Sequence, residues 1–225
     1  MNKNKNNVSK IICTVLCLLV AFSACKKLSP DDLIMSKLKI PGLGNDERSI
    51  EGNPFIFPQG VSIEGEIRGY DGTKKSDTIL GSGSYVEVLL PLKNTNSTAT
   101  LVELPAALIF QCYSLEYQNG LLIKKIKFLV PANRTYYVLI KLYCANMARH
   151  ASSGSALYHN PIVCGTKEVV QFCDLFKNKA VNIEDKQANY ASNVSKIQSI
   201  VWDFTQRGVM PSGEKLDFIN SLPNN

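Results

Sequence analysis

The sequence predicts an α+β fold, in which an antiparallel β-sandwich is followed by a small helical segment. Residues 55–146 contain short apolar stretches interleaved with polar residues and separated by Gly, Pro, Asn and Asp. This pattern is typical of antiparallel sandwiches. Residues 147–225 instead place apolar residues three and four positions apart, which predicts helices. The helical segment can form one domain with the sandwich, since 225 residues suit a domain with an appendage.

Six short strands are expected in the sandwich, each bounded by turn residues. They are residues 61–67, 85–90, 101–104, 108–114, 121–128 and 135–144. Alternate residues of a strand share a face, so Cys144 falls on the same face as the apolar Leu142, and Cys112 on the same face as Phe110. Both cysteines are therefore expected to point into the core.

Helices are expected at residues 167–177, 193–207 and 214–221. Gly208 follows the longest of them in the position of a helix C-cap. Trp202 lies on the apolar stripe of the same helix, where packing against the sandwich is the expected role and a ligand platform the alternative. Residues 147–161 form a polar loop that contains both histidines, His150 and His159.

The N-terminus has the pattern of an export signal. Three lysines and no acid precede an apolar run at residues 11–22, and small residues follow it. The run is too short to cross a bilayer, which takes about 20 apolar residues. Residues 1–24 are therefore predicted to be a signal peptide, and residues 25–54, rich in Gly and Pro, a flexible tether.

The end of this signal, Ala21-Phe22-Ser23-Ala24-Cys25, resembles the lipobox of bacterial lipoproteins. The resemblance implies that the Cys25 thiol is acylated and that Cys25 becomes the mature N-terminus. Phe22 departs from the usual Leu, Val or Ile. Ordinary secretory cleavage after Ala24 is the alternative.

Removal of the signal changes what the composition means. The chain is 45% hydrophobic and 20% charged, which excludes collagen-like and wholly disordered proteins. Without residues 1–24 it has 201 residues, and the formal charge falls from +6 to +3 because three lysines are lost. No basic face of the kind that nucleic-acid binders carry is left, so a nucleic-acid partner is not expected.

Four cysteines remain in the domain once the signal and the lipidated residue are set aside. In an oxidising envelope they most simply form two disulfides, and three connectivities are open. One of these sets pairs Cys112 with Cys144 and Cys164 with Cys173.

The sequence offers little for an enzyme, a metal or a cofactor. His150 and His159 have no Cys or carboxylate nearby at metal-binding spacing, and the chain has no HExxH or CxxC motif. The Gly-Ser run at residues 81–84 precedes a strand, whereas phosphate loops follow one. We therefore expect a protein that is not an enzyme and that needs no metal and no cofactor.

Two short segments carry more chemistry. Tyr143-Cys144 ends the last expected strand, and Ile197-Gln198-Ser199-Ile200-Val201-Trp202 lies in the main helix. Together they resemble the thioester domains of bacterial surface adhesins. The resemblance implies that the Cys144 thiol condenses with the Gln198 amide, expelling ammonia, and that an amine on a host surface attacks the buried thioester. Gln171 is a weaker acyl donor, because Asp174 breaks the apolar pair that should follow. A Cys144 thioester would leave an odd number of other cysteines.

The whole chain resembles outer-membrane lipoproteins of Bacteroidota, which combine a signal, a lipobox, a tether and an Ig-like sandwich. Asp77-Thr78-Ile79 resembles their O-glycosylation acceptor, which would place a glycan on Thr78 in a loop. The resemblance implies a lipid-anchored outer-membrane protein, surface-exposed or facing the periplasm, that binds or adheres to a host or cell-surface protein or glycan. A covalent thioester adhesin is the alternative, and an envelope hydrolase is the remote one.

Overall fold

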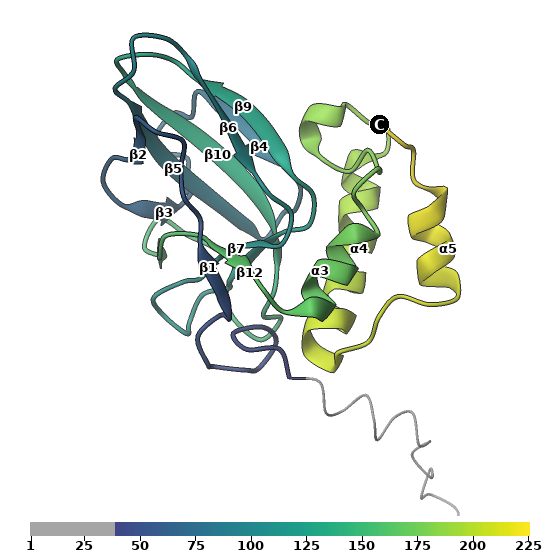
Figure 1. The fold of residues 1–225 in the computed structure, drawn as a ribbon. Coiled ribbons are helices and arrows are strands. Elements are labelled where there is room, and N and C mark those ends of the chain that lie inside the picture. The colour runs from purple at the N-terminus through teal and green to yellow at the C-terminus, as the bar shows by residue number, and fades with distance from the viewer. Residues whose placement is uncertain (1–38) are drawn as a thin grey trace, which may run out of the picture. The chain divides into compact units, whose positions relative to one another are not determined.

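Strands come first and helices last in the computed structural model, which describes residues 39–225 (Figure 1). The predicted α+β class, with a mostly antiparallel β-sandwich followed by helices, is confirmed. The strands are β1 (Gly52–Pro54), β2 (Val61–Ile63), β3 (Ile67–Gly69), β4 (Thr78–Gly81), β5 (Val86–Asn94), β6 (Thr100–Leu104), β7 (Leu108–Phe110), β8 (Gly120–Leu122), β9 (Ile126–Val130), β10 (Thr135–Cys144), β11 (Leu157–Tyr158) and β12 (Ile162–Cys164). The helices are α3 (Lys167–Asp174), the 3₁₀ turn η1 (Ile183–Asp185), α4 (Tyr190–Arg207) and α5 (Glu214–Ser221).

The long strand β10 organises the larger sheet. The order of this sheet is β1-β12-β7-β8-β10-β5-β3-β11, with β2 attached to β5 and β4 attached to β10. Strands β6 and β9 form a separate two-stranded sheet. β10 pairs with β5 over most of its length, from Thr135↔Lys93 to Leu142↔Val86, and its last two residues pair with β8. The β4–β10 pair is parallel, and the other pairs in the two sheets are antiparallel.

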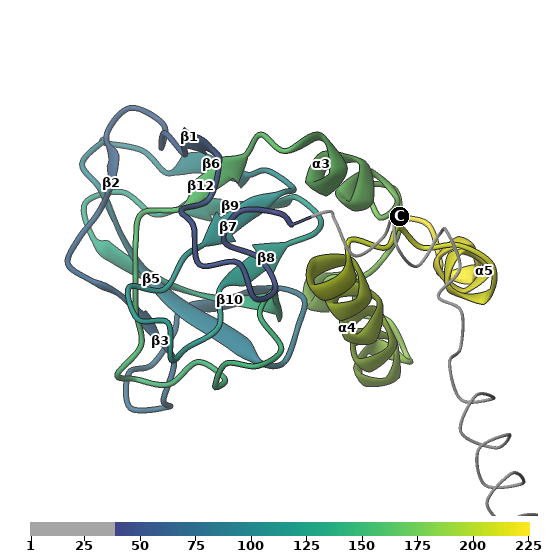
Figure 2. The same cartoon turned by 90° about the horizontal axis from the view of Figure 1, so that it is seen from below.

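Two hydrophobic cores share β10. Leu142 and Cys144 point into the sandwich core, where they meet apolar residues of β5 and of the β6–β9 sheet. Tyr143 points the other way, into a second core filled by α3 and α4. In that core the rings of Phe172 and Phe204 stack with centroids 4.3 Å apart. Figure 2 shows α3 and α4 next to β7, β8 and β10, with α5 on their outer side. The sequence prediction that Cys112 and Cys144 are core residues is confirmed.

The helix boundaries follow the sequence pattern closely. α5 spans the predicted residues, and α4 ends at Arg207 as predicted, although it begins three residues early. Gly208 is in the left-handed conformation with φ of 69°, and its N–H bonds to the carbonyl of Phe204 at 2.8 Å. A glycine adopts this conformation without steric cost, so the predicted C-cap is confirmed.

The strand predictions fail where the chain bends. The expected strand at residues 121–128 is two strands, β8 and β9, and Lys124 between them is buried. Its ammonium donates to the carbonyl of Lys179 at 2.6 Å and to the carboxylate of Asp185 at 3.0 Å. The expected strand at residues 108–114 stops at Phe110, although Cys112 still bridges to Tyr158. Strands β1, β4, β11 and β12 were not expected, since each is only two to four residues long.

The prediction of a tether up to residue 54 is wrong for residues 40–54. Ile40, Leu43 and Ile50 are buried in the second core, and β1 pairs with β12. The N–H of Gly44 donates to the carbonyl of Ala145 at 2.8 Å, which places this segment directly beside the end of β10. The signal peptide, Cys25 and the rest of the predicted tether lie outside the described residues.

The burial of this segment makes a prediction about stability. Replacing Ile40 or Leu43 by Ala should lower the free energy of unfolding by about 2–4 kcal/mol, because each change leaves a cavity in the second core. The measurement is urea denaturation of the purified chain from Lys26 onward. Ser49→Ala, at an exposed position of the same segment, should change it by less than about 0.5 kcal/mol. Equal and negligible effects at all three positions would mean that the segment is a tether after all.

Candidate functional site at the end of strand β10

The structure brings together the two residues that the sequence singles out. Cys144 is the last residue of β10, and Gln198 lies in the middle of α4, 54 positions later. The side-chain oxygen Oε1 of Gln198 accepts the backbone N–H of Cys144 at 2.9 Å. The side-chain nitrogen Nε2 of Gln198 donates to the backbone carbonyl of Cys144, also at 2.9 Å. Both residues are buried, so the contact is closed to solvent.

The local fold explains why a glutamine side chain is found here. Pairing of β10 with β5 ends at Leu142↔Val86, so Cys144 extends past the end of its neighbour. Backbone groups of alternate residues in a strand face the same edge, and the N–H and C=O of Cys144 face the edge that β5 has left. Buried backbone groups need hydrogen-bond partners. The carboxamide of Gln198 provides one acceptor and one donor and so takes the place of a strand residue.

The sulfur of Cys144 has a partner on the same helix. The indole N–H of Trp202 donates to Sγ of Cys144 at 3.1 Å. Trp202 lies four residues after Gln198, which places both side chains on one face of α4. Its ring packs against the sandwich core and meets the ring of Tyr85 at a centroid distance of 5.4 Å. The predicted packing of Trp202 on the sandwich is confirmed.

Burial dominates the electrostatics of the thiol. It raises the pKa of Cys144 to about 11, since a thiolate is poorly solvated in the core. The hydrogen bond from Trp202, the backbone N–H of Asn146 and the nearby charge of Arg149 each act in the opposite direction and lower this pKa. At neutral pH Cys144 is therefore a protonated thiol, in a residue whose backbone is bonded to the Gln198 carboxamide.

Two buried asparagines fix the chain around the site. The side-chain carbonyl of Asn146 accepts the backbone N–H of Asn119 at 3.0 Å, and its amide nitrogen donates to Gly44 at 2.8 Å. The side chain of Asn119 bonds to the N–H of Cys112 at 2.8 Å and to the carbonyl of Gly42 at 2.8 Å. Neither asparagine is predicted from the sequence, because an asparagine beside a turn is usually exposed and carries no signal of burial.

The four cysteines of the domain are buried free thiols in this structure, with neither of the two suggested disulfides. The sulfur of Cys112 donates to the carbonyl of Leu157 at 3.2 Å, while that of Cys144 meets Trp202. Cys164 and Cys173 both lie in the second core, where burial raises the pKa of Cys173 to about 12.

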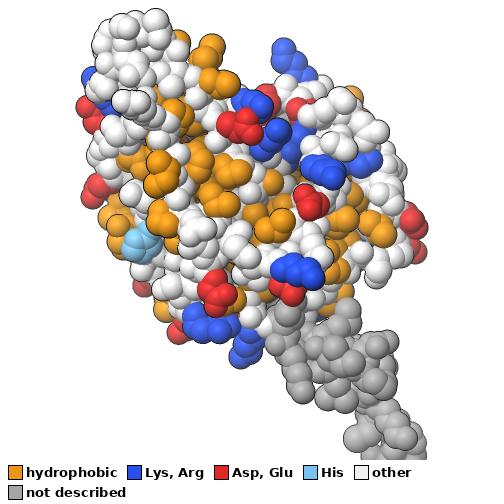
Figure 3. All heavy atoms as spheres, in the orientation of Figure 1, with side chains coloured by type: hydrophobic (Ala, Val, Ile, Leu, Met, Phe, Trp, Pro, Cys, Tyr) orange, Lys and Arg blue, Asp and Glu red, His pale blue; other side chains and the backbone are white. Residues whose placement is uncertain are grey.

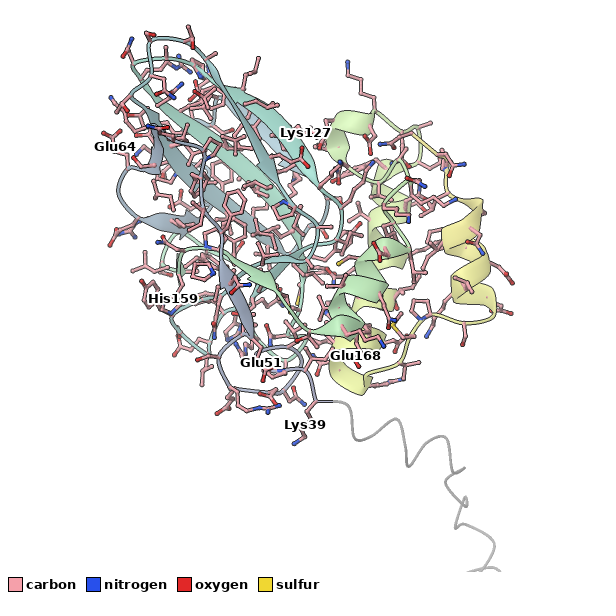
Figure 4. All side chains as sticks on the ribbon, viewed as in Figure 1. Lys39, Glu51, Glu64, Lys127, His159 and Glu168 are labelled. Carbon is pink, nitrogen blue, oxygen red and sulfur yellow. The ribbon has the colours of Figure 1, made fainter. Side chains whose placement is uncertain are left out.

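The other residues that the sequence singles out lie away from the Cys144 site or in a different element of the fold from the expected one. Gln171 is exposed on α3, so the structure favours Gln198 as the partner of Cys144. His159 stacks on Tyr113 at the edge of the sandwich that is remote from the helices (Figure 4). Thr78 is the first residue of β4, half-buried against β10, so its predicted loop position is wrong. The described residues contain no group of three or more His, Cys, Asp or Glu that could hold a metal ion.

The surface charges are mixed. On the face drawn in Figure 3, basic and acidic side chains lie among one another and among apolar ones. Elsewhere in the described residues and independently of this view, ion pairs join neighbouring strands, including Lys127 with Glu103 and Lys141 with Glu87. Within residues 39–225, no helix has both the length and the apolar character needed to cross a membrane.

The dual contact of Gln198 makes a prediction about stability. Gln198→Ala should lower the free energy of unfolding by about 2–4 kcal/mol, because it leaves a buried N–H and a buried C=O of Cys144 unpaired. Gln171→Ala, the same change at an exposed position of α3, should cost less than about 0.5 kcal/mol. Urea denaturation measures both. A Gln198→Ala variant as stable as its control would mean that the contact does not support the fold.

Comparison of the chain with protein-family models, with curated proteins and with solved structures finds no match.

Proposed function

We propose that this protein is an envelope-anchored adhesin in which Cys144 and Gln198 form an internal thioester that captures an amine-bearing partner. The observation that carries the proposal is the pair of hydrogen bonds between the Gln198 carboxamide and the backbone of Cys144. Sequence patterns leave a non-covalent and a covalent adhesin open. A buried primary carboxamide bonded to the backbone of a residue with a buried thiol favours the covalent one.

The condensation needs no oxidant and no cofactor. Sγ of Cys144 adds to the side-chain carbonyl carbon of Gln198, the C–N bond breaks, and Nε2 leaves with the thiol proton as ammonia. The backbone N–H of Cys144 already bonds to Oε1, the atom on which negative charge develops during the addition. Preformed donors at such an oxygen lower the barrier to acyl transfer.

Burial supports the later use of the bond. Water would hydrolyse an exposed thioester, and Cys144 and Gln198 are both almost completely buried. When a primary amine reaches the carbonyl carbon, a C–N bond forms, the C–S bond breaks, and Cys144 is regenerated as a thiol. The partner is then joined to Gln198 by an amide. Lysine side chains of a host or cell-surface protein, or amino groups of a glycan, have the required chemistry.

A glutamine that only completes the strand edge would make the same two hydrogen bonds. A chain with the thioester and a chain with an unmodified Gln198 differ, however, in mass. The intact mass of the purified chain should be lower than the sequence mass by one ammonia. Incubation with methylamine should add one methylamine as a methylamide on Gln198, which leaves the chain heavier than the sequence mass by one CH2 group. Cys144→Ala and Gln198→Ala should abolish the deficit, and Gln171→Ala should keep it. A mass explained by free thiols or by loss of hydrogen alone would contradict the thioester.

The anchor is the second part of the proposal and has its own test. Cys25→Ala should move the protein from the membrane fraction to the soluble fraction, because acylation of Cys25 would be its attachment to the bilayer. Cell fractionation with immunodetection measures the distribution. Cys13→Ala, in the apolar run of the signal, serves as the control and should leave the protein on the membrane. A Cys25→Ala protein that stays membrane-bound would refute lipid anchoring.

A further inference from the structure

We propose that Trp202 is a catalytic residue of this site, whose indole N–H stabilises the Cys144 sulfur as it leaves when an amine opens the thioester. The inference rests on the proposed function, which does not itself assign a role to Trp202. The inference adds that Trp202 sets the rate at which an amine opens the thioester.

The direction of the Trp202 contact is fixed by chemistry. An indole N–H can only donate, so the 3.1 Å contact to Sγ of Cys144 is a hydrogen bond with sulfur as the acceptor. Sulfur accepts such a bond weakly as a thioester and strongly as a thiolate, since hydrogen bonds to charged groups are the stronger ones. The bond therefore favours the state in which the sulfur carries negative charge.

This difference acts on the step that consumes the thioester. As the amine nitrogen bonds to the carbonyl carbon of Gln198, the electron pair of the C–S bond moves to Sγ of Cys144. The amine loses a proton, and the thiolate gains one to end as a thiol. Only an interaction that strengthens during the step accelerates it, and the Trp202 hydrogen bond has that property.

Trp202 also covers the sulfur. Tyr85, which is 43% exposed, contacts the half-buried Trp202 with the two rings tilted to one another, and Trp202 bonds in turn to the fully buried Cys144. Exposure to solvent therefore falls from Tyr85 to Trp202 and from Trp202 to the sulfur-bearing Cys144. A residue that only covers the site and a residue that donates a hydrogen bond have opposite effects when replaced, because loss of cover speeds attack and loss of the donor slows it.

The experiment measures the rate of methylamine addition by intact mass on chains that carry the ammonia deficit. Trp202→Phe keeps an aromatic ring but loses the N–H, and should react about tenfold more slowly than the wild type. Replacement of Trp202 by 3-benzothienylalanine keeps the ring size and loses only the donor, and should slow the reaction to the same extent. Tyr85→Ala, which thins the cover and keeps the donor, should react at least as fast as the wild type.

A second measurement reports the hydrogen bond without the thioester. In the Gln198→Ala background, the pH profile of Cys144 alkylation gives the pKa of the thiol. Trp202→Phe should move this profile to higher pH by removing a donor that lowers the pKa. Arg149 and the backbone N–H of Asn146, the other groups that lower this pKa, are unchanged in the comparison.

The outcomes separate the two proposals. A wild-type chain without the ammonia deficit overturns the proposed function, and this inference falls with it. A chain with the deficit whose Trp202 variants react as fast as the wild type, or faster, overturns the role of Trp202 alone. Slower reaction of both Trp202 variants, together with a higher pKa of Cys144, supports it.

Discussion

The end of β10 is the point on which the two halves of the molecule depend. Tyr143 points into the second core, which α3 and α4 fill, and Cys144 points into the sandwich core. The backbone between them is therefore buried on both sides. Pairing with β5 has ended two residues earlier, which leaves the N–H and C=O of Cys144 without a strand partner on that edge of β10. The side chain of Gln198 supplies that partner. Helix α4 is thereby attached to the sheet by a polar contact of defined geometry as well as by apolar packing.

The contact between Gln198 and Cys144 completes the hydrogen bonding of the strand and also brings together the residues that the proposed thioester needs. The geometry that satisfies the strand edge bonds a primary carboxamide to the backbone of a cysteine, and the residue one helical turn further places a donor on the sulfur of that cysteine. The segment around residues 42–44, with Asn119 and Asn146, fixes the chain on the other side of Cys144. The site is therefore supported from the sheet, the helix and the N-terminal segment.

Sequence patterns predict the parts of this arrangement that follow a period. Alternation within β10 places Cys144 in the core, and helical spacing places Gln198 and Trp202 on one face of α4. The meeting of residues 54 positions apart depends on tertiary packing, and only the resemblance to thioester domains suggested it. The folded segment at residues 40–54 escaped prediction because its glycines and prolines are typical of a linker, while Ile40, Leu43 and Ile50 show no regular spacing.

Condensation of Cys144 with Gln198 would change the interactions that stabilise the end of β10. Loss of Nε2 as ammonia removes the donor to the carbonyl of Cys144, which costs about 1–3 kcal/mol for a buried acceptor. The new S–C bond closes a loop of 54 residues, and a cross-link of that length stabilises the fold by about 4 kcal/mol through its effect on the unfolded chain. The hydrogen bond from the Cys144 N–H to Oε1 involves neither Nε2 nor the thiol proton, which leave as ammonia. It can therefore persist in the thioester. On these energies the fold would tolerate both states of the pair, as the proposed bond, which forms once and is later opened by a partner, requires.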